Sequence, residues 1–218
     1  MRLPQYALAA SALLAGYGGL AWAQPTINDN FVARVTVVTG GRSTPLTIYD
    51  WYSGDVIRFD SSSAQGQSNV FQFLPGAEVL SCNTGIQAHF PTGSQYIWDG
   101  NTTCTHSPLL VLQPVPSFWG FLAKAKQNGT CSSNGRSGTL WVYEIPLGSN
   151  PTTIPVPFAK EIEVCANGNT PISMIWLGPS WPPSSTLATY LELDFTVFIP
   201  GVPPQDDYCL PNVCATGK

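Results

Sequence analysis

The stretch "FVARVTVV", residues 31–38, sets the fold class because its hydrophobic pattern has a period of two. One set of alternating positions holds Phe31, Ala33, Val35 and Val37, and "TGG" then supplies a turn at residues 39–41. This period is typical of a β-strand with one face buried, and the turn is typical of a hairpin. The stretch therefore predicts antiparallel strands.

The same signals recur along the chain. Further strands are predicted at residues 46–51, 56–61, 70–74, 77–81, 96–99, 140–145, 161–165, 172–177 and 189–198. Residues 117–126 differ: Ser117 could cap a short helix that Asn128-Gly129 would end, or the segment could form an irregular lip over a sheet. Many short strands and at most one helix indicate an all-β sandwich or barrel.

The first 23 residues have the features of a secretory signal peptide. They begin with one Arg, continue with a short apolar run and end on Ala21-Trp22-Ala23, a cleavage pattern of small residues around Trp22. A membrane anchor is the weaker interpretation, since the apolar run is short and rich in Gly and Ala. We expect cleavage after Ala23, a single β domain over residues 24–218, no membrane span in that domain, and secretion.

Composition narrows the function classes. The chain has 9 Lys and Arg against 13 Asp and Glu, a formal net charge of −4, so it lacks the electrostatic footprint of a nucleic-acid-binding protein. Charged residues make up only 10% of the chain, which also holds 20 Gly and 20 Pro. This composition favours an extracellular protein.

Six cysteines form an even set, and a secreted chain is expected to oxidise them to three disulfides. They allow 15 pairings, between which the sequence cannot choose. Zinc is the rival interpretation, but no C-x2-C pair is present. Asn101 and Asn128 begin the two usable N-glycosylation sequons, whereas Pro151 excludes Asn150. The six cysteines are Cys82, Cys104, Cys131, Cys165, Cys209 and Cys214.

A second hairpin is predicted in "IYDWYSGDVIRFD", residues 48–60, around a turn at Ser53-Gly54. A loop of two or four residues gives the same facing, because the two differ by an even number of residues. One face then carries Leu46, Ile48, Ile57 and Phe59. The other carries Thr47, Tyr49, Val56, Arg58 and Asp60, so that Arg58 and Asp60 form a surface ion pair.

No catalytic residue is predicted. Asp50 and Asp55 flank the turn, where we expect water to reach them and to keep their pKa values ordinary. Burial of either one against a second acid would instead favour a hydrolase. No G-x-S-x-G, H-E-x-x-H, P-loop or dinucleotide motif occurs, and His89 and His106 lie in loop-like sequence.

Aromatic side chains are the most abundant candidates for a binding site in this sequence. Most of them are expected to be core, but a curved, incompletely closed sheet can also present them to a cavity for an apolar ligand. The candidates for that cavity are Trp98, Phe118, Trp119, Phe121, Trp141 and Trp176.

Several segments in order along residues 31–214 resemble ependymin-related proteins, particularly the short versions found in algae and other protists. "YDWYSGDVIRFD" resembles the family's Y-D-x-x-N/G-x-x-x-R-x-D hairpin, and "FIPGVPPQDDYCLPNVC" is similar to its ending, with Tyr208, Pro211 and Cys214 at the matching positions. "SFWGFLAKAKQNGTC", "SGTLWVYE" and "CANGNTPISM" are similar to the corresponding middle portions.

The resemblance implies a secreted glycoprotein with a half-open β-barrel, two curved antiparallel sheets around a deep apolar pocket, similar to bacterial lipoprotein carriers. It also implies calcium binding and a role in the extracellular matrix or in adhesion, and no enzymatic activity. No calcium ligand can be assigned, since Asp206-Asp207, Glu192 and Asp194 lack EF-hand spacing. The chain lacks the N-terminal cysteine of vertebrate members, so their disulfide pairing cannot be transferred to it. Cys209 is an extra cysteine inside the terminal motif, which could pair locally or with Cys131 or Cys165.

Three functions follow as hypotheses. The first is a carrier of a hydrophobic small molecule or lipid, which needs a cavity of roughly 300 Å³ or more. The second is a matrix or cell-surface glycoprotein with a filled interior, whose partners would be matrix components. The third and least favoured is an extracellular hydrolase. Open sheet edges leave homodimerisation open as well.

Overall fold

A computed structural model describes residues 23–63, 66–74, 76–80, 87–90, 92–99, 103–108, 117–149, 151–152, 156, 158–180 and 186–215. The described chain is almost entirely β-structure, and all of its strand pairs are antiparallel. Its strands are β1 (Asn30–Thr39), β2 (Arg42–Trp51), β3 (Val56–Ser63), β4 (Gly66–Phe73), β5 (Glu78–Leu80), β6 (Gln87–His89), β7 (Ser94–Trp98), β8 (Cys104–Pro108), β9 (Lys126–Ser133), β10 (Arg136–Glu144), β11 (Glu161–Asn167), β12 (Thr170–Pro179) and β13 (Leu187–Pro200).

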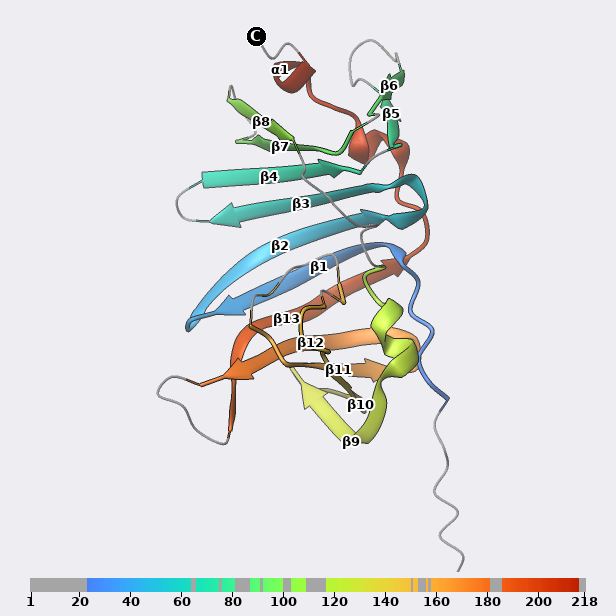
Figure 1. Ribbon diagram of the computed structural model, residues 1–218, viewed down its shortest axis with the longest axis vertical. Coiled ribbons are helices and arrows are strands. Elements are labelled where there is room, and N and C mark those ends of the chain that lie inside the picture. Colours follow the sequence, from blue (N-terminus) through green and yellow to red (C-terminus); the bar gives the residue numbers. More distant parts are fainter. Residues whose placement is uncertain are drawn as a thin grey trace, which may run out of the picture.

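Eleven of these strands form one curved sheet in the order β8-β7-β4-β3-β2-β1-β13-β12-β11-β10-β9, and β5 and β6 form a separate hairpin (Figure 1). Each half of the sheet is a meander of neighbouring strands, and the pairing of β1 with β13 joins the halves. The edges β8 and β9 do not meet, so the barrel is half open, as expected. It is built as one continuous sheet rather than as two.

The hydrophobic core changes sides within this sheet. Phe31 pairs with Asp50 and Asp50 with Ile57, which places these residues on one face, here called the inner face. Val32 pairs with Tyr49, Tyr49 with Arg58 and Arg58 with Phe71, so Phe71 lies on the opposite, outer face. Phe31 and Phe71 are both fully buried. Strands β10–β13 and β1 therefore bury their inner face, whereas β4 and β7 bury their outer face.

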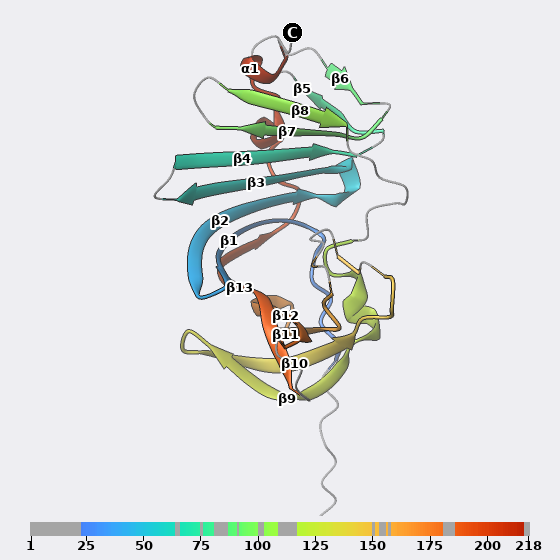
Figure 2. The same cartoon turned by 60° about the vertical axis from the view of Figure 1, so that its left-hand side comes forward.

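The inner core is covered by the short 3-10 helix η2 (Gly120–Lys124) and the residues just before it (Figure 2). Phe118 packs edge-on against Phe31 with ring centroids 5.2 Å apart, and Trp119 lies 5.5 Å from Phe195. Gln24 fastens the start of the described chain to this cover, because its side-chain amide donates hydrogen bonds to the carbonyls of Leu122 and Ala125. The strands of the sheet and the short helix η2 thus enclose the inner core.

The C-terminal segment covers the outer core through the 3-10 helix η3 (Gln205–Tyr208) and the α-helix α1 (Asn212–Ala215). Tyr208 is fully buried there and packs 5.7 Å from Trp51. Arg58 anchors the segment: it donates two 2.7 Å hydrogen bonds to Asp60 and a third to the carbonyl of Asp207. The predicted ion pair is confirmed, but its side chains are only 17% exposed, because the C-terminal segment covers them.

Two disulfides whose cysteines both lie among the described residues cross-link the fold. Cys104–Cys214 ties α1 to the edge strand β8, and Cys131–Cys165 joins β9 to β11. The Cα atoms of Cys131 and Cys165 lie 5.8 Å apart although β10 separates their strands, a separation that would be about 9.6 Å in a flat sheet, so the sheet curls sharply here. These pairs exclude the partners expected for Cys209, which is itself disulfide-bonded; Cys82 lies outside the described residues.

Three strands were not predicted: β6, β8 and β9. The Asn128-Gly129 pair does not end a helix but lies inside β9, where the register slips opposite Thr139–Trp141 and Gly129 has a φ of 89°. The predicted helix over residues 117–126 is only the five-residue η2, and Ser117 does not cap it. Cross-strand pairing with β10 outweighs the local helix signals. Among the described residues, no helix is long and apolar enough to cross a membrane.

The Arg58 anchor predicts a stability effect. Arg58→Met should lower the free energy of unfolding by about 2–3 kcal/mol, because it leaves Asp60 and the Asp207 carbonyl without their charged donor. It also removes the guanidinium from between the rings of Tyr49 and Phe71, which lie 5.0 and 4.9 Å away. Urea denaturation measures the change. Arg34→Met, at an exposed position of β1, is the matched control, and an equal loss in both variants would contradict the anchor.

Candidate functional site

A cavity of about 840 Å³ opens where the segment between β10 and β11 crosses the ends of β12 and β13. Its wall is mainly apolar, and its volume lies within the range of small-molecule binding sites. The apolar side chains that line it include Ile145, Leu147, Val156, Phe158, Trp176 and Leu187.

The backbone around the cavity is held by an extension of the sheet beyond β10 and β11. The amide of Ile145 donates a 2.8 Å hydrogen bond to the carbonyl of Lys160, and the amide of Lys160 donates a 2.7 Å bond to the carbonyl of Leu177. A turn follows at Pro146, whose carbonyl accepts hydrogen bonds from both the amide and the hydroxyl of Ser149. The base of the loop between β10 and β11 is therefore tied to the backbone of β12.

Apolar side chains are exposed around the cavity to an unusual extent. Leu147 is fully exposed, Phe158 is 83% exposed and Leu187 is 40% exposed. Phe158 also has a left-handed backbone with a φ of 67°, a conformation that strains a bulky residue. Its carbonyl lies over Gly178, where a Cβ atom would come within 2.9 Å of the carbonyl oxygen. Contiguous exposed apolar groups beside a cavity are typical of a binding site.

Three charged residues line the cavity within the described chain. Lys160 carries a positive charge, and Glu144 and Glu161 carry carboxylates. Glu144 and Glu161 are direct cross-strand partners. Burial raises the pKa of the Glu161 carboxyl, and the negative charges of Glu163 and Glu144 raise it further. The carboxylates thus repel one another without a basic neighbour that lowers the pKa of Glu161.

Of the six aromatic residues predicted to line a cavity, one lines the large cavity and the others pack in the two cores. Trp176 lines the cavity, although it is only 1% exposed. Phe118, Trp119, Phe121 and Trp141 belong to the packed inner core. Trp98 packs against the outer core, 6.3 Å from Phe71. That any of them binds a ligand stays a prediction.

Sequence reasoning missed Leu147, Val156, Phe158 and Lys160. The available signal was a run of apolar residues among turn residues in "IPLGSNPTTIPVPFAKE", residues 145–161. Turn-rich sequence is normally polar and exposed, so large apolar side chains inside it indicate either packing or binding.

The expectation for Asp50 is wrong. Asp50 is only 2% exposed, since alternation places it on the inner face with Ile48, and its Oδ2 atom has no hydrogen-bond partner within the described chain. Burial raises the pKa of the Asp50 carboxyl well above its usual value, and the negative charge of Asp29 raises it further. Asp55 is exposed, as expected, at the end of the four-residue turn.

Asp29 connects this carboxyl to the cover of the inner core. One oxygen of Asp29 accepts a 2.9 Å hydrogen bond from the amide of Trp119. Asp29 and Trp119 also line a second cavity of about 240 Å³ between the start of the described chain and η2, but Asp50 does not line it. Trp119 Nε1 and Ser117 Oγ are buried without partners in the part of the chain that the structure describes. Two acids therefore lie near each other, without a shared cleft.

The remaining predicted sites are placed as follows. His89 and His106 lie in strands β6 and β8 rather than in loops; His106 stacks on Tyr96, with ring centroids 4.6 Å apart. Asn128 is exposed on the edge strand β9, and Asn101 lies outside the described residues. Within the described chain, no group of three or more His, Cys, Asp or Glu side chains could hold a metal ion. Calcium binding and glycosylation stay predictions.

Comparisons with known proteins find similarity to solved structures only. No protein-family model matches the chain, and no curated protein matches it. The crystal structure of MucB aligns with it at 14% sequence identity and a TM-score of 0.37, over 88% of this chain and 60% of the MucB chain. The chain thus spans less than two thirds of the length of MucB. The resemblance to ependymin-related proteins has no support from these comparisons and stays a prediction.

The burial of Asp50 predicts a pH-dependent stability. Because the folded-state pKa is raised, the protonated carboxyl stabilises the native state below the unfolded pKa of about 3.9, and this contribution is lost as the pH rises through the folded pKa. Asp50→Asn does not titrate. When the pH is raised from 4 to 8, the free energy of unfolding of the wild type should therefore fall by about 1–3 kcal/mol more than that of Asp50→Asn.

Chemical denaturation at both pH values measures this difference. Asp55→Asn is the matched control, because it removes an exposed carboxyl from the same hairpin and Asn tolerates the left-handed backbone at this position. A pH dependence that is the same in Asp50→Asn as in the wild type would contradict the burial of an unpaired carboxyl.

Proposed function

We propose that the protein is secreted and binds an apolar, lipid-like ligand in the cavity between β10, β11 and the ends of β12 and β13. The observation that carries the proposal is the apolar cavity of about 840 Å³, with Leu147 and Phe158 exposed at its wall. A structural glycoprotein would be expected to fill its interior, and this volume exceeds the roughly 300 Å³ that separates the two hypotheses. The disulfides support an oxidising compartment.

The exposed wall also explains how a ligand would gain affinity. An apolar ligand that covers Leu147 and Phe158 removes both side chains from water, which contributes about 1.5–3 kcal/mol for each one fully buried. The Phe158 ring is already exposed before a ligand arrives, so it does not have to leave the core to contact one.

The test is titration of the secreted protein with N-phenyl-1-naphthylamine, which fluoresces in apolar sites. The wild type should bind it saturably. Leu147→Ser combined with Phe158→Asn should raise the Kd at least about tenfold, and Asn suits the left-handed backbone at residue 158. Val202→Ser removes an exposed apolar side chain away from the cavity and should leave the Kd unchanged. Equal binding in all three proteins would refute this site.

The burial of Asp50 near Asp29 favours a second candidate, an extracellular hydrolase. Against it, Asp50 lines neither of the two cavities described above, so neither of them brings a substrate to the carboxyl. A panel of aryl glycosides and esters separates the two functions. Hydrolysis by the wild type that Asp50→Asn abolishes, in a folded variant, would establish the hydrolase. Absence of turnover in both proteins would leave Asp50 as a structural residue.

A further inference from the structure

We propose that Lys160 makes the cavity selective for amphiphiles with an anionic head group, whose apolar chain occupies the cavity. This inference rests on the proposed function and adds the chemical class of the ligand. Lys160 is the one basic residue that lines the cavity within the described chain. The other wall residues already described are apolar, apart from two glutamates and the turn serine.

The position of Lys160 is fixed by the sheet. Its amide and carbonyl are both bonded to neighbouring strands, at 2.7 Å to Leu177 and 2.8 Å to Ile145. Because Glu144 pairs with Glu161, these bonds extend the register by one residue and set Lys160 opposite Ile145. Ile145 packs against the inner core. Lys160 therefore lies on the inner face, together with Trp176, which also lines the cavity.

The two glutamates also line the cavity, but the register places them on the other face of the sheet from Lys160. Glu161 alternates with Ile162, which is fully buried in the inner core, so Glu161 and its partner Glu144 lie on the outer face. The causes that shift the pKa of Glu161 are consistent with this arrangement, since they include Glu163 and Glu144 but not Lys160. The ammonium group of Lys160 is thus not neutralised by its sequence neighbour.

Lys160 is also without a partner in the rest of the described chain. The ion pairs found there are Arg58–Asp60 and His89–Glu78, and Lys160 belongs to neither. Its side chain is exposed, so its charge is hydrated until a ligand arrives. A compact ammonium group beside an apolar cavity can pair with a carboxylate or phosphate whose hydrocarbon chain enters that cavity. A neutral amphiphile with the same chain would gain only the apolar contact.

The experiment compares three ligands with one chain length: dodecanoate, dodecyl phosphate and dodecanol. Each displaces N-phenyl-1-naphthylamine from the secreted protein at pH 8, below its micelle concentration and at low salt. For the wild type we expect the anions to bind about 3–10 times more tightly than dodecanol, a preference that 0.5 M NaCl reduces. A preference for only one of the two anions would identify the head group as carboxylate or phosphate.

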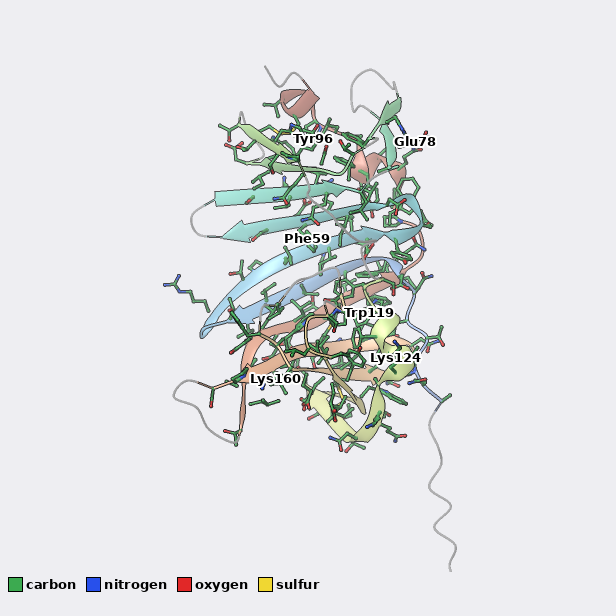
Figure 3. The ribbon with its side chains drawn as sticks, in the orientation of Figure 1. Phe59, Glu78, Tyr96, Trp119, Lys124 and Lys160 are labelled. Atoms are coloured by element: carbon green, nitrogen blue, oxygen red, sulfur yellow. A yellow bond between two sulfur atoms is a disulfide. The ribbon has the colours of Figure 1, made fainter. Side chains whose placement is uncertain are left out.

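Lys160→Gln should remove the preference and leave dodecanol binding unchanged. Lys124→Gln is the matched control: this exposed lysine lies in η2, and Figure 3 shows it and Lys160 toward opposite ends of the lower strands. It should keep the preference. If dodecanol binds as tightly as the anions, or if Lys160→Gln keeps the preference, the head-group inference is wrong and the apolar site survives. If neither the dye nor any ligand binds, both proposals fail.

Discussion

The fold depends on antiparallel register across one continuous sheet whose core changes sides. Register carries a side chain's face from strand to strand, so Phe31 on β1 and Phe71 on β4 must point in opposite directions. Each half of the sheet then needs its own cover. The cover of the inner face comes from the middle of the chain, at η2, and that of the outer face comes from the C-terminal segment.

The hairpin between β2 and β3 is the transition between the two cores. Ile57 is buried on its inner face and Val56 on its outer face, so consecutive residues are both withdrawn from water. Arg58 belongs to the same transition, because it is the residue through which β3 binds the C-terminal cover. The disulfide between β8 and α1 closes that cover at the far edge of the sheet. The hairpin of β2 and β3 thus contributes to both cores and also binds the distant C-terminal segment.

Much of the sheet could be predicted from period-two patterns, including β1 and the facing of residues on either side of the Ser53-Gly54 turn. The pattern could not show which face would be covered. Asp50 follows Leu46 and Ile48 on the inner face. Because it lies only a few residues before the turn at Ser53-Gly54, its sequence position suggested that water would reach it. Asp50 is influenced by Asp29, which in turn bonds to Trp119, and only the tertiary structure brings these three residues together. The strand β9 was missed for a similar reason, since its exposed polar sequence pairs only because β10 lies beside it.

Departures from local rules include two groups with different surroundings, besides Trp98 and Tyr208, which bury polar atoms without described partners in the outer core. Near η2, Asp50, Ser117 and Trp119 each bury a polar atom without a partner in the described chain, inside a packed core. Beside the large cavity, Leu147 and Phe158 expose apolar surface, Phe158 strains its backbone, and Glu161 has a raised pKa. Departures of this kind are expected where a site must contact something outside the chain. The cavity of about 840 Å³ lies at the second place, where a ligand that covers the exposed apolar side chains would remove them from water, so this place fits the proposed binding site better than the packed aromatic core does.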